Sequence, residues 1–270
     1  MRGRILLHCQ DITVRLISDY GTPEILQTGA IGSCYHYRSR SHKRLSAHKL
    51  NQLRDSLRQE TNGLLHAFPT QFHDLYKTFQ KIRNHHDFKG LKLKLAICHI
   101  KNDGIVPDDE MTAETLGEGI WACKTEPEAF AEEALELIYE QNGGKTLLAD
   151  TDGVKKGTII FTSTLGVLRR NSDYMANRMT SITSALATRG FAKKHSKYGV
   201  HCIHAVSVGR IVDGDTEETR TGKHMRAEDV GHMYLWLSQQ PGSLWVHQLE
   251  LRPAQGPFLK FKDSWIHGLF

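Results

Sequence analysis

Histidines are the first residues of this chain whose number and spacing could support metal chemistry. The sequence contains 16 of them among 270 residues. His85 and His86 are adjacent, so we expect their side chains to lie on different faces of any regular element. His201 and His204 stand three apart in a predicted strand, which places them on opposite faces, and His247 alternates with apolar residues as a packed side chain does. We therefore expect no metal site.

The cysteines could form disulfides or bind a soft metal. There are five, an odd number, and no two of them form the C-x-x-C pair that is typical of metal or redox sites. A scattered, odd set indicates buried thiols in a reducing compartment. These residues are Cys9, Cys34, Cys98, Cys123 and Cys202.

Charge is distributed unevenly along the chain, although the formal net charge is only +5. Residues 35–101 contain 14 Lys or Arg and 4 Asp or Glu, a balance of +10, whereas residues 102–153 contain 2 and 14, a balance of −12. Neighbouring blocks of opposite sign suggest two surfaces that bind different partners, such as RNA phosphates on the basic block. The alternative is two solvated surfaces that partly neutralise each other.

Hydrophobic periodicity predicts the elements that must position any site. Apolar or alternating runs predict strands at 3–9, 30–37, 64–68, 91–100, 157–163, 200–208 and 244–251. Apolar stripes predict helices at 42–60, 72–83, 112–122, 127–140, 173–189 and 227–238, and residues 12–17 also have roughly helical spacing. Pro127 is favoured near the start of a helix. Residues 141–156 are long and polar enough to suggest a loop insertion.

Strands and helices alternate in this order, so we expect one α/β domain that covers residues 1–270. Strands separated by helix-length crossovers form a parallel sheet with helices on both faces, the doubly wound Rossmann-like architecture, here with about seven strands. A hydrophobic fraction of 39% excludes low-complexity disorder. No apolar run approaches the roughly 18 residues that a membrane-spanning helix needs.

Three stretches of the second half resemble the short-chain dehydrogenase/reductase family. Residues 157–187 are similar to the family's fifth strand, active-site loop and helix, residues 198–213 to its sixth strand and cofactor loop, and residues 238–253 to its last helix and strand. The resemblance implies a nicotinamide cofactor, a tyrosine that transfers a proton, and a lysine four residues later that lowers the tyrosine pKa. It also implies a glycine-rich turn after the first strand.

The positions that match the family's catalytic residues hold other residue types in this chain. The serine position is Thr164, preceded by Ser163. The tyrosine position is Asn177 and the lysine position is Ser181, and neither residue can perform the proton transfer. No glycine stands between residues 8 and 18, where the backbone should approach the cofactor's phosphates. We therefore expect no catalytic residues and no bound cofactor.

Two other pairs of residues keep an enzymatic alternative open. Tyr174 and Arg178 have the spacing of the family's tyrosine and lysine, and the arginine charge could lower the tyrosine pKa, but the pair stands three residues too early. Arg38 and Arg40 follow the second predicted strand, where family members that prefer NADP place arginines. The alternative for this second pair is two surface arginines within a basic block.

The sequence predicts a catalytically inactive short-chain dehydrogenase-like protein, a structural or interaction subunit of a larger assembly such as a mitochondrial ribonucleoprotein. Its partners would be other protein subunits, in a homodimer, a heterodimer or a larger complex, and RNA through residues 35–101. One alternative is a divergent NADP-dependent oxidoreductase that uses Tyr174 and Arg178, and another is a regulator that binds a cofactor without turnover.

The amino-terminal residues give the only indication of location. Arg2 and Arg4, with no acidic residue before position 11, suggest a mitochondrial signal. Because the first predicted strand begins near residue 3, we expect that signal to stay uncleaved. Without such a signal the protein is expected in the cytoplasm.

Overall fold

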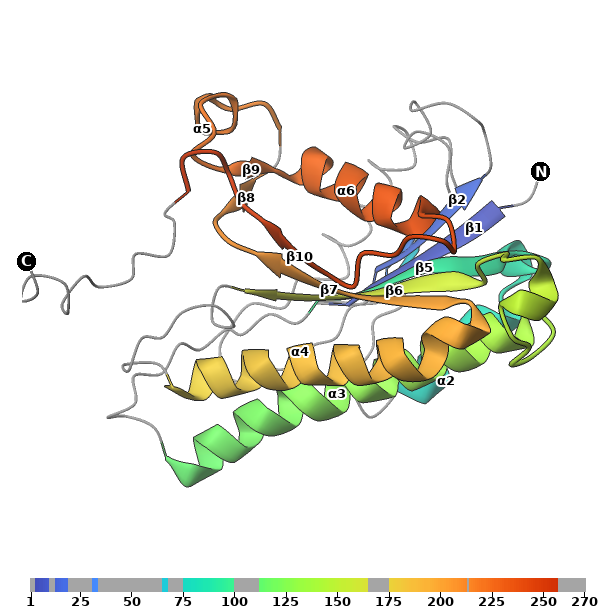
Figure 1. The fold of residues 1–270 in the computed structure, drawn as a ribbon. Coiled ribbons are helices and arrows are strands. Elements are labelled where there is room, and N and C mark those ends of the chain that lie inside the picture. Colours follow the sequence, from blue (N-terminus) through green and yellow to red (C-terminus); the bar gives the residue numbers. More distant parts are fainter. Residues whose placement is uncertain are drawn as a thin grey trace, which may run out of the picture.

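A computed structural model gives the fold of the chain (Figure 1). It describes the strands at 3–9, 13–18, 31–33 and 65–67 and the segments 75–99, 112–164, 175–212 and 214–256. A twisted sheet runs through the middle of the molecule and helices pack on both of its faces (Figure 1). The predicted α/β class is therefore confirmed.

Eight strands of the described residues form the main sheet, in the order β10-β7-β6-β5-β1-β2-β3-β4. Its parallel part consists of β10 (Gln248–Leu251), β7 (Val200–Ser207), β6 (Gly157–Thr164), β5 (Lys92–His99) and β1 (Gly3–Cys9). The remaining edge consists of β2 (Thr13–Ser18), which is antiparallel to its neighbours, with β3 (Ile31–Ser33) and β4 (Leu65–Ala67). The sheet thus has one strand more than predicted, and one strand runs against the others.

Helices cover the two faces unequally. One face carries α2 (Leu75–Asn84), α3 (Ala113–Glu140) and α4 (Met175–His195), and the other carries α6 (Ala227–Gln239) (Figure 1). Short 3-10 turns lie at η3 (His86–Phe88), η5 (Ala149–Thr151) and η8 (Ser196–Tyr198). Among the described helices, none is long and apolar enough to cross a membrane.

Each face of the sheet has its own buried apolar cluster. The first packs under α2, α3 and α4 and includes Phe79, Phe130 and Phe161, all at most 1% exposed. The second packs under α6 and includes Ile160 and Leu237. Because both faces are covered, β6 and β7 read in the sequence as nearly continuous apolar runs, which is why they were predicted correctly.

Strand β2 corrects the interpretation of residues 12–17 as a segment with helical spacing. It pairs antiparallel with β1, from Gly3 opposite Ser18 to His8 opposite Thr13. Only residues 10–12 separate the two strands, so they form a hairpin. β-Branched side chains at Thr13, Val14 and Ile17 favour the extended conformation, and cross-strand pairing outweighs the weak helical periodicity.

Helix α3 is a single helix where the sequence predicted two, at 112–122 and 127–140. Pro127 lies inside it, not at a helix start. A proline removes one backbone donor, but the turns after it bury Phe130, Ala134 and Ile138 against the sheet. Tertiary packing of this kind supplies most of the stability of a helix in a protein, so it outweighs the local break signal.

Several other boundaries also differ from the predictions. The strand predicted at 244–251 begins only at Gln248, because Val246 N donates to the side chain of Gln240 and not to a strand. The strand predicted at 30–37 is described only as β3. Residues 141–156 connect α3 to β6 and contain η5. The helix predicted at 42–60 lies outside the described residues.

Candidate functional site

The carboxyl ends of the parallel strands form the edge at which ligands of open α/β sheets bind. β5 ends at His99, β6 at Thr164 and β7 at Ser207. Thr164 is the register partner of Ser207, so the ends of β6 and β7 are level. The position that matches the family's serine therefore lies at the last residue of β6, on this edge.

Three of the predicted positions lie in the first two turns of α4, which begins at Met175. These positions are Asn177, Arg178 and Ser181. A connection of residues 165–174 joins β6 to α4, so the helix starts near the carboxyl edge of the sheet. The predicted residues that lie outside the described part of the chain are Tyr174, Arg38 and Arg40.

A serine–histidine contact lies beside this edge and was not predicted. The hydroxyl of Ser163 is 2.8 Å from Nε2 of His204. His204 is the register partner of Phe161 on the neighbouring strand, so Ser163, two residues further along β6, lies on the same face. The alternation of side chains between the two faces of each strand was the only sequence signal for this contact. It could not be used without the register between β6 and β7, which the sequence does not give.

Burial sets the protonation state of this pair. His204 is 1% exposed, and burial, with a smaller effect of the Arg189 charge, lowers its pKa to about 4. Its imidazole is therefore neutral near pH 7 and can hold or accept the serine proton. Nδ1 of His204 is buried without a hydrogen-bond partner in the described structure, so no third group orients the ring.

His201 lies on the opposite face of β7, as the sequence predicted. Its ring stacks on Trp245 with centroids 4.8 Å apart, and its Nε2 is 2.9 Å from the carbonyl oxygen of Val246. Burial lowers the pKa of His201 to about 3, so this neutral ring donates its Nε2 proton to the carbonyl. His247, with Nδ1 3.0 Å from the carbonyl of Cys202, also holds the strand β10 region in place. His201 therefore acts in packing, whereas His247, which the sequence predicted as a packed side chain, is exposed.

A further buried polar group lies at the amino ends of β6 and β7. The hydroxyl of Tyr139 is 2.7 Å from Nδ1 of His195, and Nζ of Lys156 donates to the carbonyl of Thr146 at 2.6 Å. Burial lowers the pKa of His195 to about 4 and also lowers the pKa of Lys156. This group lies at the edge opposite the carboxyl ends of the strands, where it joins α3 to α4 and holds the connection that precedes β6.

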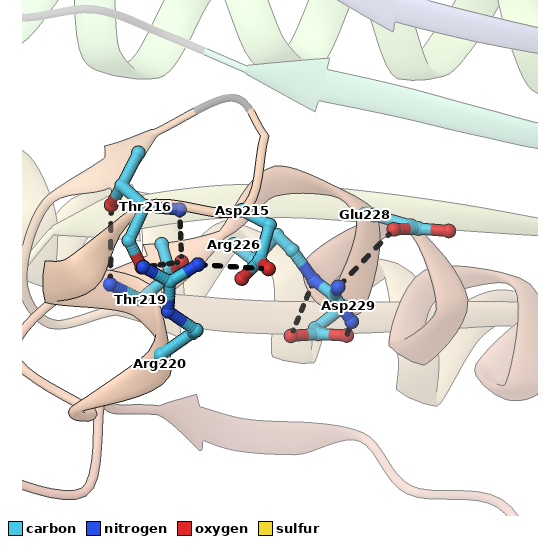
Figure 2. A network of polar contacts seen from close by, with 7 residues as sticks. All are labelled: Asp215, Thr216, Thr219, Arg220, Arg226, Glu228 and Asp229. Atoms are coloured by element: carbon cyan, nitrogen blue, oxygen red, sulfur yellow. Dashed lines mark hydrogen bonds and ion pairs between the residues drawn. The ribbon is translucent and has the colours of Figure 1, made fainter.

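The segment after β7 forms a small lobe stabilised by its own polar contacts, as Figure 2 shows. It contains the ribbon of β8 (Ile211–Val212) and β9 (Met225–Arg226) and the short helix α5 (Glu217–Arg220). Arg226 Nη2 donates to Asp229 at 2.8 Å, Arg220 Nη1 to Asp215 at 3.3 Å, and Thr216 and Thr219 cap α5 (Figure 2).

This lobe is also held against the segment that follows β10. Gly209 has a φ of +123°, and a Cβ there would stand 3.0 Å from Cδ of Pro253. Gln255 N donates to the carbonyl of Gly222 at 2.7 Å. These contacts join the lobe to the segment that follows β10.

The described residues do not provide a phosphate cradle after β1. A dinucleotide site needs a glycine-rich turn and a helix N-terminus directly after the first strand. Here β2 follows β1 and runs back beside it. Among the described residues, β1 is therefore followed by a paired strand and not by a helix.

One prediction about the histidines was wrong in its geometry. The rings of His85 and His86 do share a side, because they stack with centroids 4.8 Å apart at an interplanar angle of 18°. His85 has an extended backbone and His86 begins the 3-10 turn η3, so the alternation of a regular element does not apply. With Asp87 they form the one group of three potential metal ligands among the described residues.

Comparisons with known proteins give a match in structure only. No family model and no curated protein matches the sequence. A short-chain dehydrogenase from Rhodopseudomonas palustris shares 17% identity and a TM-score of 0.56, over 77% of this chain and 83% of that one. An alcohol dehydrogenase from Thermococcus sibiricus, solved with 5-hydroxy-NADP, shares 13% identity and a TM-score of 0.59, over 79% and 85%.

A third solved structure gives the same result. A short-chain dehydrogenase from Burkholderia cenocepacia in complex with NADP shares 11% identity and a TM-score of 0.58, over 81% of this chain and 84% of that one. The chain thus has the α/β fold of a Rossmann-like protein with helices on both faces of its sheet. More specifically, its fold is that of the short-chain dehydrogenases/reductases, which confirms the fold implied by residues 157–253.

Proposed function

We propose that this chain is a catalytically inactive protein of the short-chain dehydrogenase/reductase fold that acts as a structural or interaction subunit of a larger assembly. The observation that carries the proposal is the hairpin of β1 and β2. A cofactor-binding member of this fold needs a helix N-terminus after β1 to receive the pyrophosphate. In this chain that place is taken by a strand that pairs with β1 from His8 back to Gly3.

The residue types at the reacting positions support the same proposal. Asn177 and Ser181 stand one turn apart at the start of α4, where the fold's tyrosine and lysine would stand by the sequence register. An amide and a hydroxyl supply neither an ionisable proton near neutral pH nor a charge that lowers a neighbouring pKa. A nicotinamide bound there would find no acid to complete a reduction.

An exposed apolar pair on α4 supports a role in subunit contact. Ile182 is 41% exposed and Leu186 is 60% exposed, and their spacing of four residues places them on one face of the helix. Exposed aliphatic side chains that share a face are typical of protein–protein interaction sites. The family pairs subunits through this helix, so the second subunit is either another copy or a related chain.

Charge supports an anionic partner for the basic block. The balance of +10 over residues 35–101 suits the phosphates of RNA, whose binding depends on released counterions. This is the basis on which we propose a ribonucleoprotein assembly, located in the mitochondrion. Such contacts recognise the backbone and carry no sequence preference.

A second candidate function is an NADP-dependent oxidoreductase. Two proteins of the same fold were solved with NADP or 5-hydroxy-NADP, and this keeps NADP as a candidate ligand. In that function NADPH would deliver a hydride to a carbonyl carbon, and Tyr174 would deliver a proton to the carbonyl oxygen beside Arg178. The hairpin at β1 weighs against it.

Titration of the purified protein with NADPH, followed by nicotinamide fluorescence, separates the two functions. We expect no spectral change up to millimolar NADPH. Binding at micromolar concentration together with oxidation of NADPH in the presence of a carbonyl substrate would overturn the inactive function, and loss of that turnover in Tyr174→Phe would support the second candidate. Binding without turnover would favour a regulator that binds the cofactor. Sedimentation of a cell extract before and after ribonuclease treatment tests the assembly. We expect the chain to sediment in a fast fraction and to move to a slower fraction after ribonuclease treatment. Sedimentation as a single subunit before the treatment would contradict the assembly.

A further inference from the structure

Three potential metal ligands stand next to one another in the turn between α2 and β5. They are His85, His86 and Asp87, and each can offer one ligand atom. All three atoms lie within 4.8 Å of one another. The group lies outside the carboxyl edge described above and has no part in the proposed function.

The carboxylate of Asp87 faces one nitrogen of each imidazole. Its Oδ1 is 3.1 Å from Nε2 of His86, and its Oδ2 is 3.9 Å from Nδ1 of His85. The backbone creates this arrangement, because His85 is extended (φ −71°, ψ 128°) and the next residue begins η3. The change of conformation between them turns two consecutive rings to the same side.

The turn that carries these residues is anchored in the core. Phe88, which ends η3, is 4% exposed and packs in the cluster under α2 and α3. The ring of His85 contacts it, with centroids 4.8 Å apart. His85 and Asp87 are therefore held in place by the anchored turn. His86, whose side chain is 86% exposed, can rotate toward an ion that arrives from solvent.

Two imidazole nitrogens and one carboxylate oxygen are a donor set that suits Zn²⁺ and its neighbours in the transition series. Ligand atoms bonded at about 2.0–2.2 Å to a tetrahedral ion lie about 3.3–3.5 Å from one another. The longest separation between the three ligand atoms therefore has to shorten by about 1 Å when the ion binds. Three protein ligands leave one position of the tetrahedron for water.

We propose that His85, His86 and Asp87 form a binding site for a divalent cation of the zinc class. The ion joins His85, the N-cap residue of η3, to His86 and Asp87 within η3. It therefore stabilises the connection between α2 and β5. The site is open to solvent, so its ion exchanges freely.

Calorimetric titration of the full chain with ZnCl₂ tests the proposal. His86→Ala removes one ligand, and because this side chain is 86% exposed we expect the variant to fold as the wild type does. Asp87→Asn removes the carboxylate charge and keeps the shape. His232→Ala is the matched control, since His232 is an exposed histidine on α6. We expect zinc affinity to fall at least tenfold in the first two variants and to be unchanged in the control.

Other histidines could also bind zinc, so the position of the ion is measured as well. Anomalous scattering at the zinc edge from a zinc-soaked crystal should place one ion between residues 85 and 87. Equal affinity and stoichiometry in His86→Ala and the wild type would overturn the proposal. So would the absence of a heat of zinc binding to the wild type.

Discussion

The hydroxyl of Ser163 lies 2.8 Å from Nε2 of His204, and this contact joins β6 to β7 on the face that α4 covers. Ser163→Ala leaves the buried imidazole with no partner on either nitrogen, because Nδ1 already has none. We expect the free energy of unfolding to fall by about 1–3 kcal/mol. Urea denaturation measures it. Ser163→Thr, which retains the hydroxyl, should lose less, and equal losses in the two variants would contradict the role of the hydrogen bond.

Three buried histidines make stability depend on pH. Burial lowers the pKa of His195 and His204 to about 4 and that of His201 to about 3. The unfolded chain has histidine pKa values of about 6.5, so between about pH 6.5 and 4 it binds more protons than the folded chain. Stability is therefore fully present above about pH 6.5 and is lost as the pH falls toward 4.

A histidine variant identifies the source of this loss. The wild type should lose unfolding free energy between pH 7 and pH 4.5. His204→Gln should lose less over the same range, by up to about 3 kcal/mol for this one group. The exposed His232 provides a control, and His232→Gln should leave the pH dependence as it is in the wild type. Urea denaturation at several pH values measures both. An unchanged slope in His204→Gln would show that other groups cause the loss.

Arg83 links α2 to α3 through three glutamates, Glu133, Glu136 and Glu140, at 3.3, 2.8 and 2.9 Å. Its side chain is only 13% exposed. Because the arginine and Glu133 are largely buried, we expect Arg83→Ala to lower the unfolding free energy by about 1–3 kcal/mol. Arg220, whose pair with Asp215 is exposed on both sides, is the matched control, and Arg220→Ala should change stability by less than about 1 kcal/mol.

Gly209 holds the lobe after β7 against Pro253. A φ of +123° is strained for any residue with a Cβ, and that Cβ would stand only 3.0 Å from Cδ of Pro253, so Gly209→Ala should destabilise the chain by about 1–3 kcal/mol. A Cβ added at Gly190 in α4 would meet no neighbouring atom within 4 Å, and there alanine should be neutral or stabilising by up to about 1 kcal/mol. Thermal unfolding compares the two, and limited proteolysis between residues 210 and 226 should increase only in Gly209→Ala.

Leu186 tests the proposed subunit contact on α4. Leu186→Lys places a charge at a position that is 60% exposed, so it should leave the folded subunit as stable as the wild type within about 0.5 kcal/mol. If α4 contacts a second subunit, the variant should elute later in size-exclusion chromatography. Lys193→Ala, at another exposed position of α4, is the control and should leave the elution volume unchanged. Equal elution of all three proteins would exclude this face as a contact between two copies of the chain.

The second half of the fold could be predicted from the sequence because its signals are local and agree with one another. β6 and β7 are covered on both faces, so their β-branched and apolar runs mark them directly. α4 and α6 carry apolar stripes on a polar background. The match of residues 157–253 to a known fold depended on these elements and was confirmed by the solved structures.

The first half gave weaker signals, because its structure depends on pairing. Strand β2 (Thr13–Ser18) depends on its pairing with β1, and Pro127 stays inside α3 because distant strands pack on the next turns. The contact of Ser163 with His204 depends on the register of two strands 41 residues apart in the chain. The stacking of His85 on His86 depends on a 3-10 turn, which periodicity does not mark.

The hairpin of β1 and β2 also changes the order in which the sheet can assemble. Without β2, the first strand could pair only with a strand far along the chain. Its parallel partner β5 begins at Lys92. A hairpin closes within about 1–10 μs, whereas a distant parallel pairing first has to close a long loop. During synthesis β1 therefore gains a partner as soon as Ser18 leaves the ribosome, and one of its two edges is protected from aggregation long before the centre of the sheet exists.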